Sequence, residues 1–226
     1  MKKMQNKLRR LLQRWLYWVL ALLINATGHA LTIAANLGSA VWTASAVNIY
    51  HLWPLSLRMT LFLCGFVVAL VNAALIHHFS WWHFIGNLGF VIPFSILIQF
   101  FVEKLAIFKI GSWPLILQIS VDIIGVMMVA LATSIYQRVN LILHPNDDLM
   151  QILRYRYLHG SAARAQMVHY VPPLMIMLVT FVWTHHLWAV NIGTLFCLLF
   201  QGSLIGFFDT HIFRKLKHYQ IQGLHT

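Results

Sequence analysis

Six long apolar segments, separated by shorter polar stretches, constrain the fold of this chain more than any other feature. A helix needs roughly 20 mostly apolar residues to cross the hydrocarbon core of a bilayer, and each segment is about that long. Only 9% of the 226 residues are charged, too few to cover the surface of a soluble protein of this size. The sequence therefore predicts an all-α, polytopic membrane protein with about six transmembrane helices. The expected spans are 16–36, 57–77, 83–102, 115–137, 169–185 and 187–208.

The positive charges indicate how the chain lies in the membrane. If the N-terminus is cytoplasmic, thirteen of the sixteen Lys and Arg residues fall on that side, and only Arg58, Lys104 and Lys109 fall outside. Cytoplasmic connections of membrane proteins carry such an excess of positive charge, so we expect both termini in the cytoplasm. The same distribution accounts for the net charge of +11 without nucleic acid. It also predicts that the basic cytoplasmic segments contact anionic lipid.

Two connections between the spans are not ordinary loops. Residues 37–56 are too apolar for a free loop and too short for a full span. The connection 138–168 contains a predicted helix that begins near Pro145 and carries Asp147 and Asp148 in its first turn, where acidic side chains are favourable. Both connections therefore predict re-entrant or interfacial helices.

The third and sixth spans resemble one another, which indicates an internal repeat. The run IGNLGFVIPFSILIQFF from Ile85 aligns without a gap with IGTLFCLLFQGSLIGFF from Ile192. Gly28 and Gly125 occupy similar places in the first and fourth spans. Because three spans are an odd number, a second copy enters the membrane from the opposite side, as in the inverted repeats of secondary transporters.

This repeat suggests a division of the chain, which we treat as a single membrane domain, 1–226. The N-terminal segment places leucines and cations in the pattern of a helix that lies in the membrane interface. The expected parts are a basic interfacial helix 1–15, a first repeat 16–104, a second repeat 105–209 with the cytoplasmic loop 138–168, and a cytoplasmic tail 210–226.

Several of these motifs are similar to those of a known family. The runs GHALTIAANLGSAVW, IGNLGFVIPFSILIQFF, HPNDDLM and IGTLFCLLFQGSLIGFFD, which together span roughly residues 20–210, resemble the bacterial YczE/YyaS/YitT membrane proteins. Members typically carry Pro-Trp after the first Leu-Gly turn. Here Val41 stands before Trp42 instead, while Pro145 and Asp147 keep the second version of the motif. The resemblance implies a bacterial plasma-membrane protein that is loosely transporter-like, and it implies no mechanism.

Polar residues inside the spans are the candidates for a solute or proton pathway. Asp122 is the sharpest, because a carboxylate about eight residues into a span is costly unless it faces a cavity or a partner. Asn25 and His29 of the first span are expected to face it, and Asn87 and Gln201 add polar groups to the third and sixth spans. The alternative for each is a hydrogen bond that holds two helices together.

Other residue patterns point to no chemistry. Arg58 and Arg164 are expected to contact anions or lipid headgroups at the two membrane faces. The chain has thirteen histidines, but the pairs at 77–78 and 185–186 fall on opposite faces and lack the spacing of a helical ligand pair. The sequence predicts no metal, cofactor or catalytic residue, and no enzyme.

The combination of a repeat, two irregular segments and a buried carboxylate favours a secondary transporter or exporter. Its cargo would be a small organic solute, with coupling to protons through Asp122. The alternative is a membrane scaffold that transports nothing and supports the assembly or activity of other proteins. The sequence does not name the substrate and leaves a homo-oligomer open. A polar cavity between the spans distinguishes the two functions, since only a transporter needs one.

Overall fold

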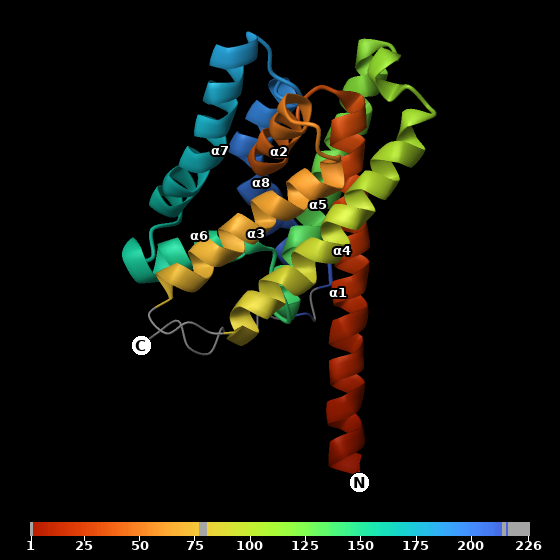
Figure 1. Ribbon diagram of the computed structural model, residues 1–226. Coiled ribbons are helices and arrows are strands. Elements are labelled where there is room, and N and C mark those ends of the chain that lie inside the picture. Colours follow the sequence, from red (N-terminus) through yellow and green to blue (C-terminus); the bar gives the residue numbers. More distant parts are fainter. Residues whose placement is uncertain (1, 77–80, 214–215, 217–226) are drawn as a thin grey trace.

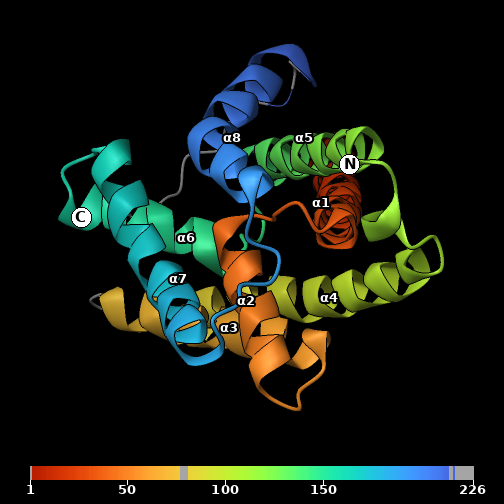
Figure 2. The same ribbon diagram turned by 90° about the horizontal axis from the view of Figure 1, so that it is seen from above.

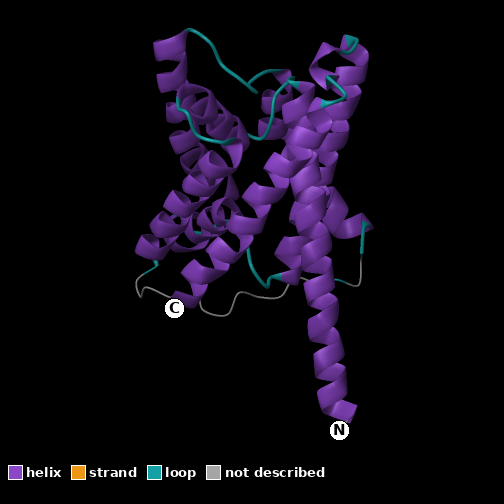
Figure 3. Cartoon of the chain, turned by 45° about the vertical axis from the view of Figure 1, so that its right-hand side comes forward, coloured by secondary structure: helices purple, strands orange, loops and turns teal. Residues whose placement is uncertain are grey.

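The computed structural model describes the whole chain except residues 1, 77–80, 214–215 and 217–226 (Figure 1). The described chain is helical and contains no strand, and its loops gather at the two ends of a helical bundle (Figure 3). Six helices are long and apolar enough to cross a membrane, which confirms the all-α, multi-pass architecture. They are α1 (Lys2–Ala35), α3 (Leu57–Leu75), α4 (Trp81–Ala106), α5 (Leu115–Val139), α7 (Ala162–Thr184) and α8 (Ile192–His211).

Two short helices lie where the sequence predicts irregular segments. Helix α2 (Val41–Leu52) follows α1, and α6 (Pro145–Ile152) follows α5 and continues into a π-helical turn, η2 (Leu153–Tyr157). A single 3-10 turn, η1 (Ile110–Ser112), connects α4 to α5. Both short helices pack inside the bundle rather than on its outside, because α2 contacts α7 and α3, and α6 contacts α3, α7 and α4.

Three helices begin well away from the expected residues: α1 at Lys2, α7 at Ala162 rather than 169, and α8 at Ile192 rather than 187. Helix α1 runs unbroken from Lys2, so no turn separates the segment 1–15 from the first span, since the chain has no glycine or proline before Gly28. Helix α8 begins at Ile192, later than expected, with the Asn191 side chain accepting a hydrogen bond from the Ile192 N–H at 2.8 Å. Position 77 and most of the tail 210–226 lie outside the described residues.

Helices α1 and α5, here called the central pair, pack against each other more extensively than any other two described helices, and they cross at two glycines. A Cβ atom on Gly28 would lie 2.7 Å from the Gly125 carbonyl oxygen, and one on Gly125 would lie 2.8 Å from the Gly28 carbonyl oxygen. The two backbones therefore touch directly, as small residues allow in membrane helices. In the N-terminal half of α1, Arg14 Nη2 donates a hydrogen bond to the Val139 carbonyl at 2.7 Å and so caps the C-terminal end of α5.

Seen from above, α8 and α4 flank this pair, and α2, α3, α6 and α7 lie to one side of it (Figure 2). Helix α4 packs against α1, α8 packs against α5, α7 packs against α2, and α3 packs against α6. Helices α3 and α4 also pack against each other along the bundle. No comparable packing joins α7 to α8 among the described residues. A hydrogen bond from the Gln166 side chain of α7 to the Leu198 carbonyl of α8, at 3.4 Å, links the two helices.

The glycine crossing leads to a first testable expectation. A Gly28→Ala substitution should lower the stability of the detergent-solubilised protein by about 1–3 kcal/mol, because the added methyl group would force the two central backbones apart. The measurement is the thermal unfolding midpoint. Gly86→Ala is the matched control, since a Cβ atom there meets nothing within 4 Å. Equal midpoints for the two variants would contradict the close crossing.

Candidate functional site

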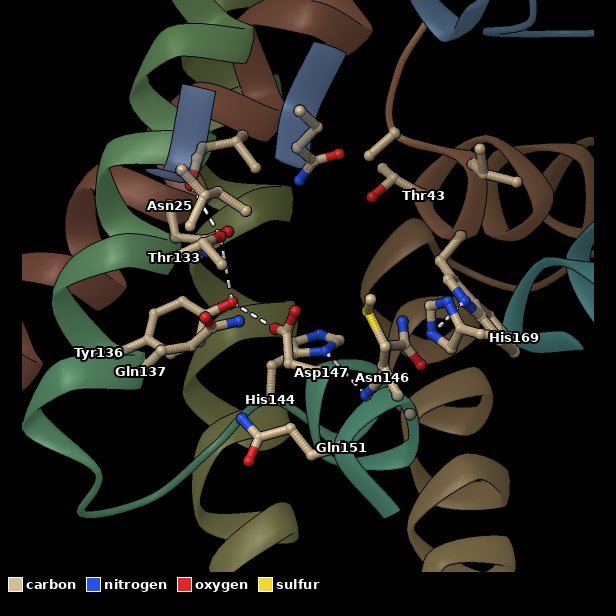
Figure 4. Close-up of a pocket in the computed structure, with 18 of the residues that line it drawn as sticks. Asn25, Thr43, Thr133, Tyr136, Gln137, His144, Asn146, Asp147, Gln151 and His169 are labelled. Carbon is tan, nitrogen blue, oxygen red and sulfur yellow. Dashed lines mark hydrogen bonds between the residues drawn. The ribbon is translucent and has the colours of Figure 1, made fainter. Parts of the chain in front are cut away.

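A pocket of about 790 Å³, here called the central pocket, lies between the helices. All eight helices contribute to its lining, so it is a feature of the whole fold (Figure 4). It extends from Asn25 and His29, in the middle of α1, to Asn140 at the end of α5 and to Tyr155 of η2. The pocket reaches the protein surface at this end, because the Tyr155 side chain is exposed. Pockets for small molecules have about this volume, roughly 300–1,000 Å³.

The short helix α6 places its first turn in the central pocket. The His144 Nδ1 atom accepts a hydrogen bond from the Asn146 N–H at 3.2 Å and caps the helix. Pro145 occupies the first helical position, where its missing N–H costs nothing. Asp147 follows in the first turn, so its carboxylate benefits from the positive end of the helix dipole. The HPND sequence therefore both starts the helix and presents a carboxylate to the cavity.

Asp147 is held by a hydrogen bond from helix α5. The Tyr136 hydroxyl donates to the Asp147 carboxylate, and the Tyr136 oxygen lies 3.2 Å from Thr133 Oγ1 (Figure 4). Burial raises the pKa of Asp147 to about 6, although the hydrogen bond from Tyr136 opposes this shift. A carboxyl group with such a pKa exchanges its proton near neutral pH.

Three histidines face the central pocket, and the hydrogen bonds of two of them assign their protons. The Trp42 indole N–H can only donate, and it donates to His169 Nε2 at 2.9 Å, so the His169 ring carries its proton on Nδ1. His144 Nδ1 is an acceptor, and burial lowers the pKa of His144 to about 3, which keeps this ring neutral. The third histidine, His29, lies with Nδ1 3.0 Å from Thr43 Oγ1.

Two polar atoms of the pocket wall have no partner among the described residues. They are Asn25 Oδ1 and Asn146 Oδ1, and Asn25 is only 2% exposed. Buried polar atoms are nearly always paired with protein, water or a ligand. These two unpaired acceptors therefore indicate a pocket that is built to hold water or a polar solute.

The structure brings some of the sequence-based candidates together and separates others. Asn25, His29 and Gln201 line the central pocket. Asp122 does not: its carboxylate lies against Gly193 in the first turn of α8, where the helix dipole favours negative charge, and its Oδ1 has no partner among the described residues. Asn87 also lies outside the pocket and belongs to a separate polar cluster.

This polar cluster fixes α6 to helices α3 and α4. The Asn72 and Asn87 side-chain amides donate to the Asp148 carboxylate at 3.2 and 3.0 Å, and His83 makes a close contact with the same oxygen. Asn72 also donates to the Pro145 carbonyl at 2.8 Å. Asp148 is buried, and these partners supply the hydrogen bonds that its carboxylate would otherwise make with water. The neighbouring acids thus have different contacts: Asp148 anchors α6, and Asp147 faces the pocket.

Removing the anchor is expected to destabilise the fold strongly. Asp148→Ala removes the acceptor of the buried Asn87 amide and the contacts that Asn72 and His83 make with the same oxygen, at a cost of about 3 kcal/mol. Asp148→Asn keeps one acceptor oxygen and should lose less. The thermal midpoints of both variants in detergent test this ranking, and an Asp148→Ala protein as stable as the native one would refute the anchoring role.

The remaining sequence-based candidates lie away from the central pocket. Arg58 and Arg164 are exposed in the first turns of α3 and α7, each just after a serine, Ser56 or Ser161, that caps its helix. Within the described parts of the chain, no group of three His, Cys, Asp or Glu residues is placed to hold a metal ion.

The sequence-based pathway candidates did not include four residues that line the pocket. Tyr136, His144, Asp147 and His169 come from α5, the α5–α6 connection, α6 and α7, and no local pattern joins them. One signal was available, because the HPND segment follows Asn140 at the same distance at which the α2 segment follows Asn36. If both segments are half-helices of a repeat, side chains at their first turns are expected near the centre of the bundle.

Residues 12–210 match a protein family described as a family of unknown function (DUF6198). The chain belongs to this family. No curated protein and no solved structure is similar enough to count as a match. The family description names no activity and no link to the YczE/YyaS/YitT proteins, so that resemblance stays a prediction.

Proposed function

We propose that this member of DUF6198 is a secondary transporter or exporter of a small organic solute. The central pocket carries the proposal, because a scaffold that only docks other proteins needs no polar cavity inside its bundle. The pocket lies at the crossing of the two central helices and is bounded by two short helices, the arrangement found at the binding sites of many secondary transporters. The proposal involves no chemical change of the solute.

We also propose that the segments 16–104 and 105–209 form an inverted repeat. The packing follows this symmetry when each helix of the first half is exchanged with its counterpart in the second half. The contact between α1 and α4 then corresponds to the contact between α5 and α8, and the contact between α2 and α7 corresponds to that between α6 and α3. The corresponding residues Gly28 and Gly125 touch each other, as residues on a pseudo-two-fold axis must. Asn36 and Asn140 both adopt left-handed backbone angles, φ 55° and φ 46°, at the ends of α1 and α5.

The one strong departure from this symmetry supports a mechanism of alternating access. Helices α3 and α4 pack together, whereas no comparable packing joins the corresponding helices α7 and α8 in the described part of the chain. The central pocket extends between these two, with Gln166 and Tyr170 from α7 and Gln201 and Ile205 from α8. By the proposed symmetry, a second state exists in which α7 and α8 close and α3 and α4 separate. The solute would then reach the pocket from the other membrane face.

The charge distribution supports an orientation for this mechanism. With both termini in the cytoplasm of a bacterial plasma membrane, the pocket opening near Asn140 and Tyr155 faces the cytoplasm. The basic N-terminal part of α1 extends beyond the bundle on the same side (Figure 1). It would there contact anionic lipid.

A pair of glycines on α8 allows the proposal to be tested. Gly202 lines the central pocket and Gly206 does not, and a Cβ atom on either meets nothing within 4 Å. In proteoliposomes of the purified protein, Gly202→Trp should fill the pocket and reduce flux by at least about fivefold. Gly206→Trp should leave flux nearly unchanged.

The assay measures charge movement or uptake with a panel of small organic cations, anions and neutral solutes. Flux that Gly202→Trp selectively reduces supports transport through the central pocket. No flux of any solute by the native protein, or equal flux in both variants, overturns the proposal and favours the scaffold.

A further inference from the structure

We infer that the central pocket binds a small organic cation, with an ammonium group near Asp147 and Asn146. The inference rests on the proposed function and names the class of solute that the same site would take. Its basis is the charge, the hydrogen-bonding capacity and the aromatic content of the pocket wall.

The charges of the pocket wall favour a cation. Among the described residues that line the pocket, Asp147 is the one carboxylate. Arg154 is the one Lys or Arg residue, and it lies at the surface end, where its Nε donates to the Gly160 carbonyl at 3.0 Å and its guanidinium stacks on Tyr155. The interior of the pocket therefore carries negative charge without a permanent positive charge. An anionic solute would meet repulsion there, whereas a cation would gain an ion pair in a water-poor site.

The unpaired atoms of the wall favour a cation that carries N–H groups. Asp147, Asn25 Oδ1 and Asn146 Oδ1 are all acceptors, and the two amide oxygens have no partner among the described residues. A primary ammonium group has three N–H donors, so near Asp147 and Asn146 it can use both of these neighbouring acceptors at once. A quaternary ammonium group has no donor and would leave these oxygens unpaired. His169 Nδ1 carries a proton that is directed toward the Asn146 backbone, and it can also donate to a hydroxyl or carbonyl elsewhere on the solute.

Aromatic side chains complete the site. Trp42, Phe94, Tyr136 and Tyr170 line the central pocket and provide apolar surface for the body of the solute. Their ring faces also attract a cation, which strengthens its binding where water is excluded. The best-fitting solute thus has a primary amine at one end, a compact apolar or aromatic middle and a polar oxygen at the other end.

A cation at Asp147 competes with a proton for the same carboxylate. The titratable and charged groups around the pocket are His29 of α1, Cys64 of α3, Tyr136 of α5, His144 and Asp148 beside Asp147, Arg154 and Tyr155 of η2, and His169 and Tyr170 of α7. Among the described residues, α2, α4 and α8 place no charged side chain in the pocket wall, and the titratable group of α4 nearest to Asp147 is His83, which contacts Asp148. Because Asp147 is ionised above about pH 6 and protonated below it, cation affinity should rise with pH and then level off. Because a bound cation displaces the proton from Asp147, the protein could exchange one cation for one proton across the membrane.

Tyramine is a suitable probe, since it combines a primary ammonium group, an aromatic ring and a hydroxyl group. Its acidic counterpart, 3-(4-hydroxyphenyl)propionate, has the same ring and the opposite charge. Binding of each to the purified full-length protein in detergent is measured by calorimetry between pH 5 and pH 7.5. Tyramine affinity should rise by about tenfold over this range, and the acid should bind at least about tenfold more weakly at pH 7.5.

Two variants locate the probe. Asp147→Asn should weaken tyramine binding at pH 7.5 by at least about tenfold and remove its pH dependence. Asp122→Asn, which changes a buried carboxyl group outside the pocket, should retain both. Thermal midpoints of both variants establish that they are folded.

Three results would overturn the inference: equal binding of the acid and the amine, a pH-independent affinity, or unchanged binding by Asp147→Asn. The proposed function would survive any of them if Gly202→Trp still reduced the flux of another solute. Loss of all flux in the native protein would instead remove the proposed function itself.

Discussion

Asp147→Asn is expected to abolish solute flux driven by a pH gradient. The asparagine keeps an oxygen that accepts the Tyr136 hydrogen bond, so the wall of the pocket should retain its shape. It can neither release a proton near pH 6 nor pair with a cation, as Asp147 can. Flux driven by an imposed pH gradient in proteoliposomes should therefore fall on the order of 100-fold.

The matched control for this measurement is Asp122→Asn. Both carboxyl groups are buried, yet Asp122 lies at α8 and outside the central pocket. Its replacement should leave flux within about twofold of the native value. If instead Asp122→Asn abolished flux and Asp147→Asn did not, proton coupling would run through Asp122, as the sequence alone suggested. Loss of flux in both variants, with normal thermal midpoints, would also contradict the assignment to Asp147 alone.

A disulfide between α3 and α4 is expected to stop transport reversibly. A Cβ atom on Gly65 would lie 3.2 Å from the Val91 Cβ atom, close to the roughly 3.5–4.5 Å that a disulfide requires. In a background in which both free cysteines, Cys64 and Cys197, are replaced by serine, Gly65→Cys with Val91→Cys should oxidise readily. The bond would hold α3 and α4 together and exclude the second state. Flux should fall to the background level on oxidation and recover on reduction.

A second disulfide provides the control, because it crosses parts that the proposed mechanism keeps together. A Cβ atom on Gly111 would lie 3.6 Å from the Asn36 Cβ atom, between η1 and the end of α1. Oxidation of Gly111→Cys with Asn36→Cys should therefore leave most of the flux intact. Unchanged flux in the oxidised α3–α4 variant, with the bond verified by mass spectrometry, would contradict the separation of α3 from α4.

The helices were predictable from the sequence because lipid imposes a simple requirement on length and polarity. The expected spans 57–77 and 115–137 differ from α3 and α5 by only two residues at one end. The late start of α8 was not predictable from hydropathy. It depends on Asn48 of α2, which accepts a hydrogen bond from the Trp188 N–H at 3.1 Å and donates to the Trp188 carbonyl at 2.7 Å. These bonds to a distant helix hold the preceding residues in a non-helical conformation.

The site was only partly predictable, because the sequence does not fix how each helix is rotated about its axis. Asn25 and Asp122 occupy corresponding places in the two central helices, which suggested that they face one another. The backbone contact at Gly28 and Gly125 orients the helices differently: Asn25 lines the central pocket, whereas Asp122 lies against α8. In the sequence, Asp147 had a sufficient explanation as an acidic residue in the first turn of a helix. Only the packing of α6 within the bundle gives it a cavity to face.

The most direct test of transport through the central pocket is the accessibility of Asn25→Cys in a background in which Cys64 and Cys197 are replaced by serine. A membrane-impermeant thiol reagent is applied to each face of sealed, oriented vesicles, with Arg58→Cys and Arg164→Cys as surface controls. We expect labelling at Asn25→Cys from the face that carries the N-terminus. Labelling from the opposite face should appear more slowly, as the second state forms, and should stop when α3 and α4 are cross-linked. Complete protection of Asn25→Cys from both faces, with both controls labelled, would mean a closed helical core and would contradict transport.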